Sequence, residues 1–439
     1  MISQLLFLFL LSAGSFLFAR RIGVIRRNIK SGQAWDGSDR TAERWATMAR
    51  VALGQGKMTA RPVAGIMHIL IYAGFVIINV EMLEILIDGV FGTHRVFAFL
   101  GPVYDGLIAT FEWLALGVII ACVVFFVRRN GLALARLASK DLKGWPSLDA
   151  NIILVVEVLL MFAFLSMNAA DAIAQARGLE QYINAGSFPV SAWLTPLYSG
   201  FSDAGIVAVE RGMWWFHIAG VLSFLVYVPY SKHFHIILAF PNTYYSNLNP
   251  KGQMDNMASV KREVDLMMDP SADPTAAAPA TDAPPAAFGA KDATDLTWKQ
   301  LLEAYTCTEC GRCTSECPAN QTGKLLSPRK IMMSTRDRIE EIGKQRESNG
   351  GTWTPDGKSL LGNWITEEEL WACTSCQACV EACPINISPM GIILDMRRSL
   401  IMEDSKSPES ITTMFNNIEN NGAPWAFPAG SRGDWTHEV

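Results

Sequence analysis

The sequence predicts an all-α protein, in which a five-helix transmembrane bundle is followed by a soluble α-helical domain. Half of the 439 residues are hydrophobic and 18% are charged, whereas about a quarter are charged in a typical soluble protein. The apolar residues form long runs before residue 236, and eight of the nine cysteines follow in two short groups. No strand-like alternation of apolar and polar residues stands out in this second half.

Residues 1–240 contain five apolar stretches, each about as long as a helix that crosses a bilayer. Basic residues follow the first stretch and do not precede it, so we interpret it as a retained helix and not as a signal peptide. Residues 20–62 and 128–148 together hold fifteen Lys and Arg, and the alternating loops hold two. The positive-inside rule therefore places the N-terminus outside and the chain after Tyr230 in the cytoplasm. The spans are expected at about residues 1–19, 62–87, 104–127, 150–167 and 212–230.

The stretch Trp214–Ile236 carries one histidine near each end, His217 and His235. If the stretch is one helix, the two rings share a face and lie ~27 Å apart, close to the thickness of the hydrocarbon layer. His68 lies near the cytoplasmic end of the second span, level with His235. Two imidazoles on one haem iron leave no open position and favour electron transfer. We therefore predict a haem-binding bundle in which His68 and His235 ligate one iron.

His217 lies on the outer side and needs its own partner, for which the loop residue His94 is the candidate. The sequence leaves open whether these two hold a second haem or whether His217 only makes a hydrogen bond to a neighbouring helix. His233 is expected to be an interfacial side chain. Glu112 and Glu157 lie within spans, where a carboxyl either handles the protons of a quinone or faces another helix.

The eight clustered cysteines form two identical patterns, C-x2-C-x2-C-x3-C-P, which begin at Cys307 and Cys373. In this pattern three close cysteines hold one [4Fe–4S] cluster and the fourth ligates the other cluster. Zinc is the alternative, but zinc sites use two C-x2-C pairs and not two runs of four. Cys122 lies in an apolar run and is expected to serve packing. The predicted ligand sets are Cys307, Cys310, Cys313 and Cys383 for the first cluster, and Cys373, Cys376, Cys379 and Cys317 for the second.

The chain after the bundle divides into three parts. Residues 241–295 are expected to be a flexible linker, because much of this segment is rich in Ala, Pro, Asp and Thr. Residues 296–395 are expected to form a ferredoxin-like domain with both clusters. One of its helices should begin after the N-cap Ser327 and another near Thr366. Residues 396–439 are interpreted as a partner-binding tail.

The membrane half resembles the cytochrome b subunit of membrane-bound nitrate reductases and its relatives in heterodisulfide-reductase-like complexes. The resemblance is carried by Gly65-Ile66-Met67-His68 and by the spacing of His217 and His235, with Pro229-Tyr230-Ser231-Lys232 between them. Two helices of that family each carry two haem ligands. The resemblance implies haem b at His68 and His235, and a second haem at His217. The family's partner for His217 corresponds to Ile78 here, so His94 would have to replace it.

The soluble half resembles the two-cluster domain of heterodisulfide reductase and of the iron–sulfur subunits of anaerobic glycerol-3-phosphate dehydrogenase. The segment Asn417–Trp425 is similar to the region that follows the clusters in fused members. Those members often continue into, or pair with, a domain rich in CCG motifs, and no Cys-Cys pair follows Cys383 here. The resemblance implies a membrane quinone and a cytoplasmic redox subunit as partners, either a CCG-domain heterodisulfide-reductase-like protein or a flavoprotein.

Together these observations predict an electron-transfer subunit of a quinone-linked oxidoreductase complex in a bacterial or archaeal cytoplasmic membrane, with the clusters in the cytoplasm. The net charge of −5 gives no indication of nucleic-acid binding. One alternative is a catalytic subunit that acts on a disulfide or an organic acid, which the missing CCG cysteines disfavour. Another is a redox sensor or membrane anchor. No catalytic residue is predicted.

Overall fold

The computed structural model describes residues 1–250, 252–269, 271 and 287–437. These residues form helices and loops, and the only β-type pairing among them is two isolated bridges. The prediction of an all-α fold is therefore confirmed for the described residues. Residues 251, 270 and 272–286 of the predicted flexible linker lie outside them.

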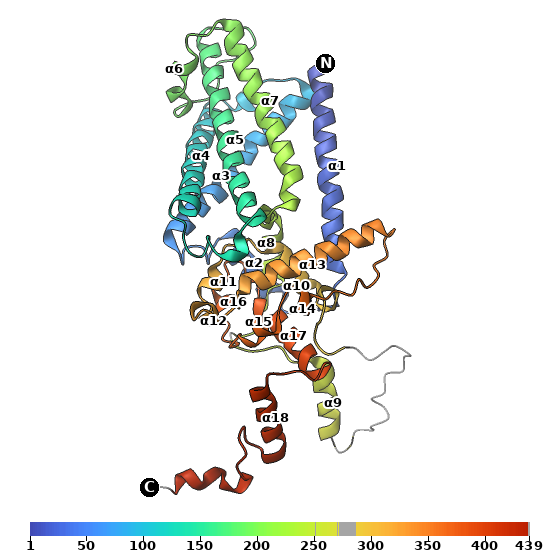
Figure 1. Cartoon of the computed structure of the whole chain (residues 1–439). Helices are drawn as coiled ribbons and strands as arrows, with labels where there is room; N and C mark the ends of the chain where they lie inside the picture. The colour runs from blue at the N-terminus through green and yellow to red at the C-terminus, as the bar shows by residue number, and fades with distance from the viewer. Residues whose placement is uncertain (251, 270, 272–286, 438–439) are drawn as a thin grey trace.

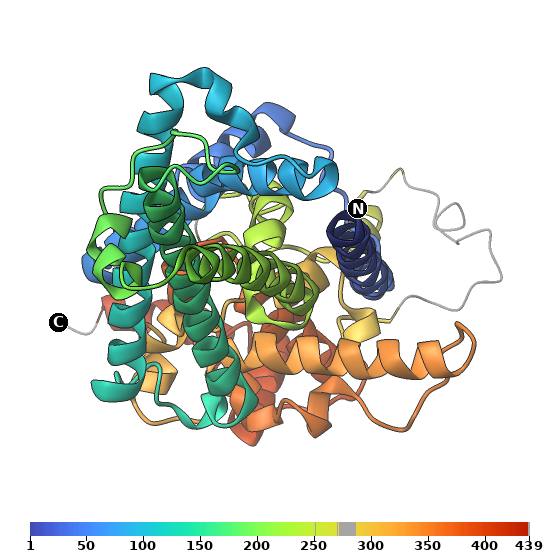
Figure 2. The same ribbon diagram turned by 90° about the horizontal axis from the view of Figure 1, so that it is seen from above.

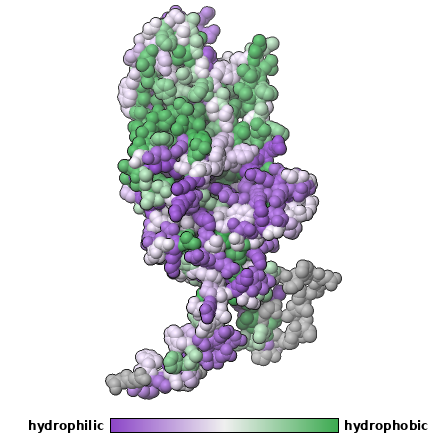
Figure 3. Space-filling model, in the orientation of Figure 1, coloured by the Kyte–Doolittle hydropathy of each residue, from purple (hydrophilic) through white to green (hydrophobic). Residues whose placement is uncertain are grey.

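Five helices are long and apolar enough to cross a membrane, and they stand side by side in the upper half of the molecule (Figure 1). Their outward surface is dominated by hydrophobic residues, whereas the lower half of the molecule is mostly polar (Figure 3). The five predicted spans are confirmed as helices. Most of them are longer than predicted because polar residues continue the helix beyond the apolar stretch, whereas the span expected at residues 104–127 has nearly the predicted length. The helices are α1 (Ile2–Lys30), α3 (Pro62–Phe91), α4 (Pro102–Phe126), α5 (Trp145–Ala176) and α7 (Asp203–Tyr227).

Within this bundle, α5 packs against α7 and α4, and α3 packs against α4, while α1 stands at the edge against α7 and α3 (Figure 2). Small buried residues such as Ala115 and Ala163 let the backbones approach closely. Phe111, Phe164 and Ile218 fill the space between the helices. Much of the packing in the bundle therefore comes from α4, α5 and α7.

The stretch from His217 to His235 is not one helix, and that prediction is wrong. Helix α7 ends at Tyr227, and two 3-10 turns follow before α8 begins at His235 (His235–Tyr244). Between these turns Ser231 is extended (φ −112°, ψ 156°). Pro229 has no N–H to continue an α-helix, which explains the break. His235 is thus positioned by α8, independently of His217.

The soluble part is a small domain of short helices below the bundle (Figure 1). The predicted helix starts are confirmed: the Ser327 side chain accepts a hydrogen bond from the amide of Lys330, and Thr366 forms a capping box with Glu369. The helices are α10 (Trp298–Thr306), α11 (Arg312–Ser315), α12 (Pro318–Gln321), α13 (Pro328–Ser348), α14 (Leu360–Asn363), α15 (Glu367–Trp371), α16 (Ala378–Ala382) and α17 (Pro389–Met402).

The soluble domain and the lower end of the bundle share one hydrophobic core, which joins Ile25 of α1 and Phe234 to Leu301 of α10. The side chain of Arg329 is fully buried and forms an ion pair with Asp141, in the loop after α4, at 2.6 Å. A buried charge of this kind is costly without its partner. The pair fixes the Lys/Arg-rich loop after α4 at the same end of the bundle as the cysteines.

Four further α-helices complete the described chain. The last residues of α17 belong to the domain core, because Met396 and Leu400 are buried there, so the compact domain continues past residue 395. The tail helix α18 and helix α9 project away from the body of the molecule (Figure 1). The four helices are α2 (Thr41–Met48), α6 (Thr195–Tyr198), α9 (Ala258–Met268) and α18 (Glu409–Asn421).

Candidate functional site

The two cysteine loops have the same backbone shape. In the first, Glu309 and Gly311 flank Cys310 and have φ angles of 56° and 72°. In the second, Ser375 and Gln377 flank the middle cysteine and have φ angles of 56° and 61°. Left-handed residues are rare outside glycine. Their repetition at matching positions indicates that both loops curl around the same kind of group.

One small cavity brings together the four cysteines that the spacing assigns to the first cluster. Its lining includes three thiols of the first loop and Cys383, which comes from the second motif. The amide of Ile387 donates a hydrogen bond to the Cys383 sulfur at 3.3 Å. Amide-to-sulfur bonds of this kind help to set the reduction potential of a cluster. The crossed arrangement of the first quartet is thus present in the fold, and its ligation of iron remains a prediction.

The second quartet lies nearer the surface. Cys379 is close enough to Cys373, Cys376 and Cys317 for their charges to act on its thiol. Cys376 is exposed, unlike the other seven clustered cysteines. The guanidinium of Arg397 donates a hydrogen bond to the carbonyl of Cys373 and another to that of Leu370. The second loop is therefore held from one side and open on the other.

The chemistry of the thiols fits a cluster of several iron ions. Burial raises the pKa of Cys307 and Cys379 to about 12, so iron must displace protons when it binds these sulfurs. In the described part of the chain, no three His, Cys, Asp or Glu side chains converge on the position of a single ion. A zinc ion would need four such ligands around one point. Thiols that surround a cavity at separate corners suit a [4Fe–4S] cube better.

His68 of α3 and His235 of α8 face each other at the lower end of the bundle, with ring centroids 6.3 Å apart and planes inclined by 42°. An imidazole nitrogen binds a metal at about 2 Å and the ring centre lies roughly 1 Å behind it, so two rings on one iron have centres roughly 6 Å apart. The separation therefore matches a pair with one iron between them. The Nδ1–H of His235 donates to the carbonyl of Lys232 at 3.0 Å, which leaves Nε2 for the metal.

The surroundings of His235 keep it in the form that binds metals. Burial lowers the pKa of His235, so the ring is neutral at neutral pH. Its neighbour His233 packs against Phe224, with ring centroids 5.4 Å apart, and burial lowers its pKa to about 3. His233 thus lies close to the pair, but its ring stands nearly perpendicular to that of His235, at 86°.

A buried ion-pair network joins the first cysteine loop to the segment that carries His235. Lys232 pairs with Glu309, which lies between Cys307 and Cys310, and Glu309 also pairs with Arg336 at 2.7 Å. Burial alone would raise the pKa of Glu309, but the charges of Arg336 and Lys232 outweigh it and lower that pKa. Burial lowers the pKa of Lys232, and its acidic partners oppose this shift. The network fixes the loop relative to α8.

Replacing Lys232 with methionine should weaken this junction. Glu309 is only 3% exposed, and removing one partner of a buried ion pair costs about 3 kcal/mol or more. Thermal denaturation of the purified protein should therefore begin at a lower temperature in Lys232→Met, and Lys232→Arg should restore most of the loss. A Lys232→Met protein as stable as the parent would show that Arg336 alone satisfies Glu309.

The first cysteine loop also lies next to His68. Arg312, between Cys310 and Cys313, donates hydrogen bonds to the carbonyls of Lys57 and Met58 at 3.1 and 3.4 Å, just before α3. His68 lies in the second turn of α3. The first quartet therefore lies beside the end of α3 that carries His68, whereas the second quartet opens to solvent at Cys376.

The structure does not bring His217 and His94 into contact. His217 is buried, and its Nδ1–H donates to the carbonyl of Leu160 at 3.1 Å. His94 instead lies against Asp171 at 3.6 Å and against the ring of Tyr182, with centroids 5.1 Å apart. No ring contact among the described residues joins the two histidines. The second haem site remains a prediction.

The sequence did not predict a buried polar network at the end of the bundle opposite the cysteine loops. Arg95 is 6% exposed and donates to Asn168 at 2.9 Å and to Tyr104 at 3.0 Å, besides its ion pair with Asp171. An arginine beside an apolar span needs such partners. This rule could have indicated from the sequence that Arg95 has buried polar partners. The partners lie on separate helices, so only the fold reveals them.

Glu112 belongs to the same region and has a structural role. Its carboxylate accepts hydrogen bonds from the amides of Val190 and Ser191 at 2.8 and 3.0 Å, and from Asn168 at 3.1 Å. One carboxylate oxygen thus holds the loop before α6, and the other holds Asn168 of α5. This geometry favours packing against the neighbouring segments over proton transfer as the role of Glu112.

Comparison with known proteins finds a family match for the domain that carries the two cysteine groups. The family model of the 4Fe-4S dicluster domain matches residues 303–387, which include both cysteine groups. One component of the ferredoxin/F(420)H(2)-dependent CoB-CoM heterodisulfide reductase of Methanosarcina acetivorans is 30% identical over 108 residues, which are 25% of this chain and 53% of the relative. The predicted resemblance to heterodisulfide reductase is confirmed for this region. No solved structure matches the chain.

Two longer relatives extend the similarity to the membrane half. The probable iron-sulfur-binding oxidoreductase FadF of Bacillus subtilis is 28% identical over 466 residues, covering 100% of this chain and 61% of FadF. The EtfAB:quinone oxidoreductase of Syntrophomonas wolfei is 26% identical over 428 residues, covering 91% of this chain and 55% of the relative. The chain thus spans about three fifths or less of these relatives' length. The chain combines a 4Fe-4S dicluster domain with five helices able to cross a membrane. It is similar to iron–sulfur oxidoreductases that transfer electrons.

Proposed function

We propose that this chain is a membrane-bound electron-transfer subunit that links a soluble redox partner to a membrane quinone through two [4Fe–4S] clusters and a haem b. The observation that carries the proposal is the 6.3 Å separation of the His68 and His235 rings at the end of the bundle beside the first cysteine loop. A ligand pair of this geometry, next to a dicluster domain, provides a continuous series of redox sites between the protein surface and the bilayer.

Each residue set has a defined role in this proposal. When bound, each cluster and each haem takes up and releases one electron. The two cysteine quartets would hold and separate the clusters, and burial shields four of the eight cysteines from water and oxygen. His68 and His235 would hold the haem iron between their two imidazoles, an arrangement that favours electron transfer over oxygen binding. Lys232 orients His235 through its carbonyl group.

The similarity to an EtfAB:quinone oxidoreductase supports EtfAB, a flavoprotein in this proposal, as the soluble partner and a quinone as the membrane partner. A CCG-domain protein of the heterodisulfide-reductase type is the other candidate partner. The exposed apolar residues of the tail, among them Phe415, Trp425 and Trp435, support its role in binding such a partner.

The basic loops support the proposed placement in the membrane. The loops before α3 and after α4 hold most of the loop Lys and Arg, and the second of them is paired with the cluster domain through Asp141 and Arg329. The positive-inside rule supports a cytoplasmic location for that end, with the N-terminus outside a bacterial or archaeal cytoplasmic membrane. The resemblance to the nitrate reductase cytochrome b supports the haem assignment.

The proposal is tested by reconstituting the purified chain in quinone-containing liposomes and adding EtfAB that has been reduced beforehand. We expect quinone reduction that depends on this chain, because electrons enter at the clusters and leave from the membrane half. Cluster and haem signals that respond to dithionite, together with no electron transfer to quinone, would contradict the quinone link. Turnover of a disulfide or an organic acid by this chain alone would favour the catalytic alternative.

The number of haems is a separate prediction. His217 is oriented as a metal ligand would be, with Nδ1 bound to a carbonyl, but His94 makes other contacts. We expect His94→Ala to leave the haem content per chain unchanged, as measured by the pyridine haemochrome assay. If His94→Ala removes one of two haems, the outer site uses His94 after all. His217→Ala is the matched variant: a loss of haem there with none in His94→Ala would show that His217 has a different partner.

A further inference from the structure

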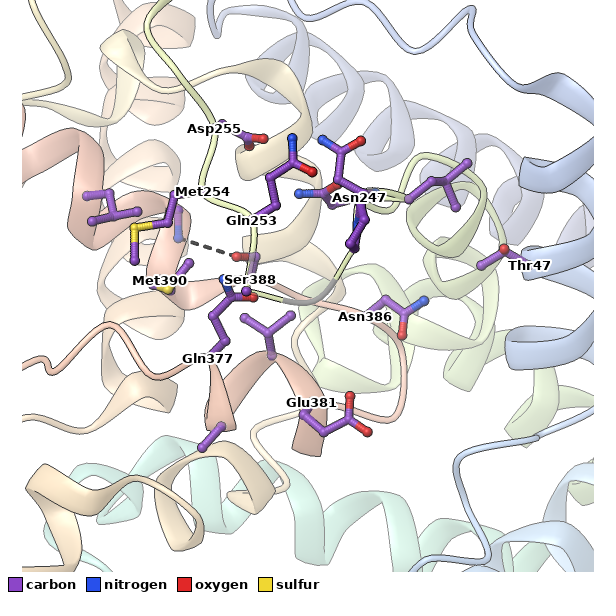
Figure 4. A pocket seen from close by; sticks show the side chains of 18 of the residues that line it. Thr47, Asn247, Gln253, Met254, Asp255, Gln377, Glu381, Asn386, Ser388 and Met390 are labelled. Atoms are coloured by element: carbon purple, nitrogen blue, oxygen red, sulfur yellow. Dashed lines mark hydrogen bonds between the residues drawn. The ribbon is translucent and has the colours of Figure 1, made fainter.

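A cavity of about 810 Å³ opens beside the second cysteine quartet (Figure 4). One wall is formed by residues 247–250 and 252–255, which follow α8, and the opposite wall by α16 and the start of α17. Gln377, Asn386 and Ser388 point into it from the second wall. Its volume lies within the range of ligand-binding pockets.

The second quartet is exposed at the protein surface in this cavity. Cys376 lies on its wall and is the exposed member of the eight clustered cysteines. Electron transfer slows steeply with distance, so a partner must bring its redox group close to the cluster. In this fold the cavity gives a partner direct access to the second quartet.

The lining suits a polypeptide. Carboxamides offer both donors and acceptors, as a peptide backbone does. The side chain of Gln377 lies on the cavity wall next to Cys376, and its Nε2 makes no hydrogen bond in the described structure. Two of the carboxamides on the wall, Gln300 and Asn386, already use both their oxygen and their nitrogen in hydrogen bonds within the chain. The others that line the cavity are Asn247, Asn249, Gln253 and Gln377.

The same lining does not suit a bound nucleotide cofactor. Its described residues include no aromatic ring on which a flavin or nicotinamide could stack. They include four acidic and three basic side chains, so the described lining has no positive excess for a phosphate. Some of these charges already pair with one another, as Arg398 does with Asp395 at 2.8 Å.

We propose that this cavity receives a loop of the soluble flavoprotein partner, whose backbone binds the carboxamides and whose redox group then lies next to Cys376. The inference rests on the proposed function, which supplies the cluster and the partner. When the flavoprotein is the electron donor, one electron leaves the reduced flavin and reduces the cluster by one electron. No bond forms in this step, and the flavin's own protein and solvent take up any proton.

The test fills the cavity from the wall that carries no cysteine. Gln253 is exposed and lines the cavity, so Gln253→Trp places a large side chain there without touching a predicted ligand. Thr352→Trp is the matched control, because Thr352 is an exposed loop residue that does not line the cavity. Haem reduction in the full chain is followed after mixing with reduced EtfAB or with dithionite.

We expect Gln253→Trp to slow haem reduction by EtfAB roughly tenfold or more, while Thr352→Trp and the parent react alike and dithionite reduces all three equally. An EtfAB rate in Gln253→Trp equal to that of the parent would overturn the inference. So would a parent protein that dithionite reduces but EtfAB does not, or a parent protein that binds free FMN in this cavity and loses that binding in Gln253→Trp. Failure of the proposed function gives a different result, because the protein treated with dithionite would then show no haem signal or no cluster signal.

Discussion

Replacing His235 with alanine is expected to abolish haem binding at the lower end of the bundle and to leave both iron–sulfur clusters in place. The reason is geometric: the ring centroids of His235 and His68 are 6.3 Å apart, and neither ring can hold a six-coordinate iron alone. Haem content from the pyridine haemochrome assay and iron–sulfur content from chemical analysis separate the two effects. His68→Ala should give the same result, because the two rings bind the same iron.

His233→Ala is the matched control for this prediction. Its ring lies 5.7 Å from that of His235 and has a similar environment, but the two ring planes are nearly perpendicular. His233→Ala should keep its haem. Loss of the haem in His233→Ala together with its retention in His235→Ala would transfer the ligand role to His233 and contradict the assignment.

Serine substitutions at the fourth cysteine of each motif are expected to remove the distant cluster. Cys383 lines the cavity of the first loop, so Cys383→Ser should destroy the cluster held by Cys307, Cys310 and Cys313. Each single variant should retain about half of the cluster iron, because one of two [4Fe–4S] clusters survives. Iron and acid-labile sulfide per chain, with electron paramagnetic resonance of the reduced protein, measure the loss.

Double variants reveal which cysteines belong together. Cys383→Ser combined with Cys310→Ser should still retain about half of the iron, because both residues serve the same cluster. Cys383→Ser combined with Cys376→Ser should remove nearly all of it. The opposite pattern would mean that each motif holds its own cluster, and the crossed arrangement would then be wrong.

Several features were predictable because they depend on local sequence. The five spans follow from apolar runs, and the caps at Ser327 and Thr366 follow from residue preferences at helix starts. The lengths of most spans were underestimated because polar residues can continue a helix. In α1, for example, Arg21 lies beyond the apolar run and pairs with Glu340 of the soluble domain at 2.6 Å.

The break between α7 and α8 shows where periodicity misleads. The spacing of His217 and His235 fits five helical turns, yet Pro229 ends the regular helix between them. His235 nevertheless meets His68, because both residues lie at the lower end of the bundle. Predicting at which end of the bundle a residue lies therefore requires less than predicting which side of a helix it faces.

The remaining contacts could not be predicted because they join distant segments. Arg95, in the loop after α3, reaches residues of α4 and α5, and the Lys232–Glu309 pair links the bundle to a cysteine loop. The cavity beside Cys376 exists because the segment after α8 returns past α16. No local sequence pattern specifies such contacts, because they depend on how the helix bundle and the cysteine-containing domain pack together.

The most direct measurement is the reduced-minus-oxidised optical spectrum of the purified full chain under anaerobic conditions, recorded before and after a quinone is added to the reduced protein. We predict the sharp band of a six-coordinate b-type haem on reduction, and its disappearance when quinone accepts the electrons. A spectrum without such a haem, or a reduced haem that the quinone leaves unchanged, would contradict the proposed path from the clusters to the membrane.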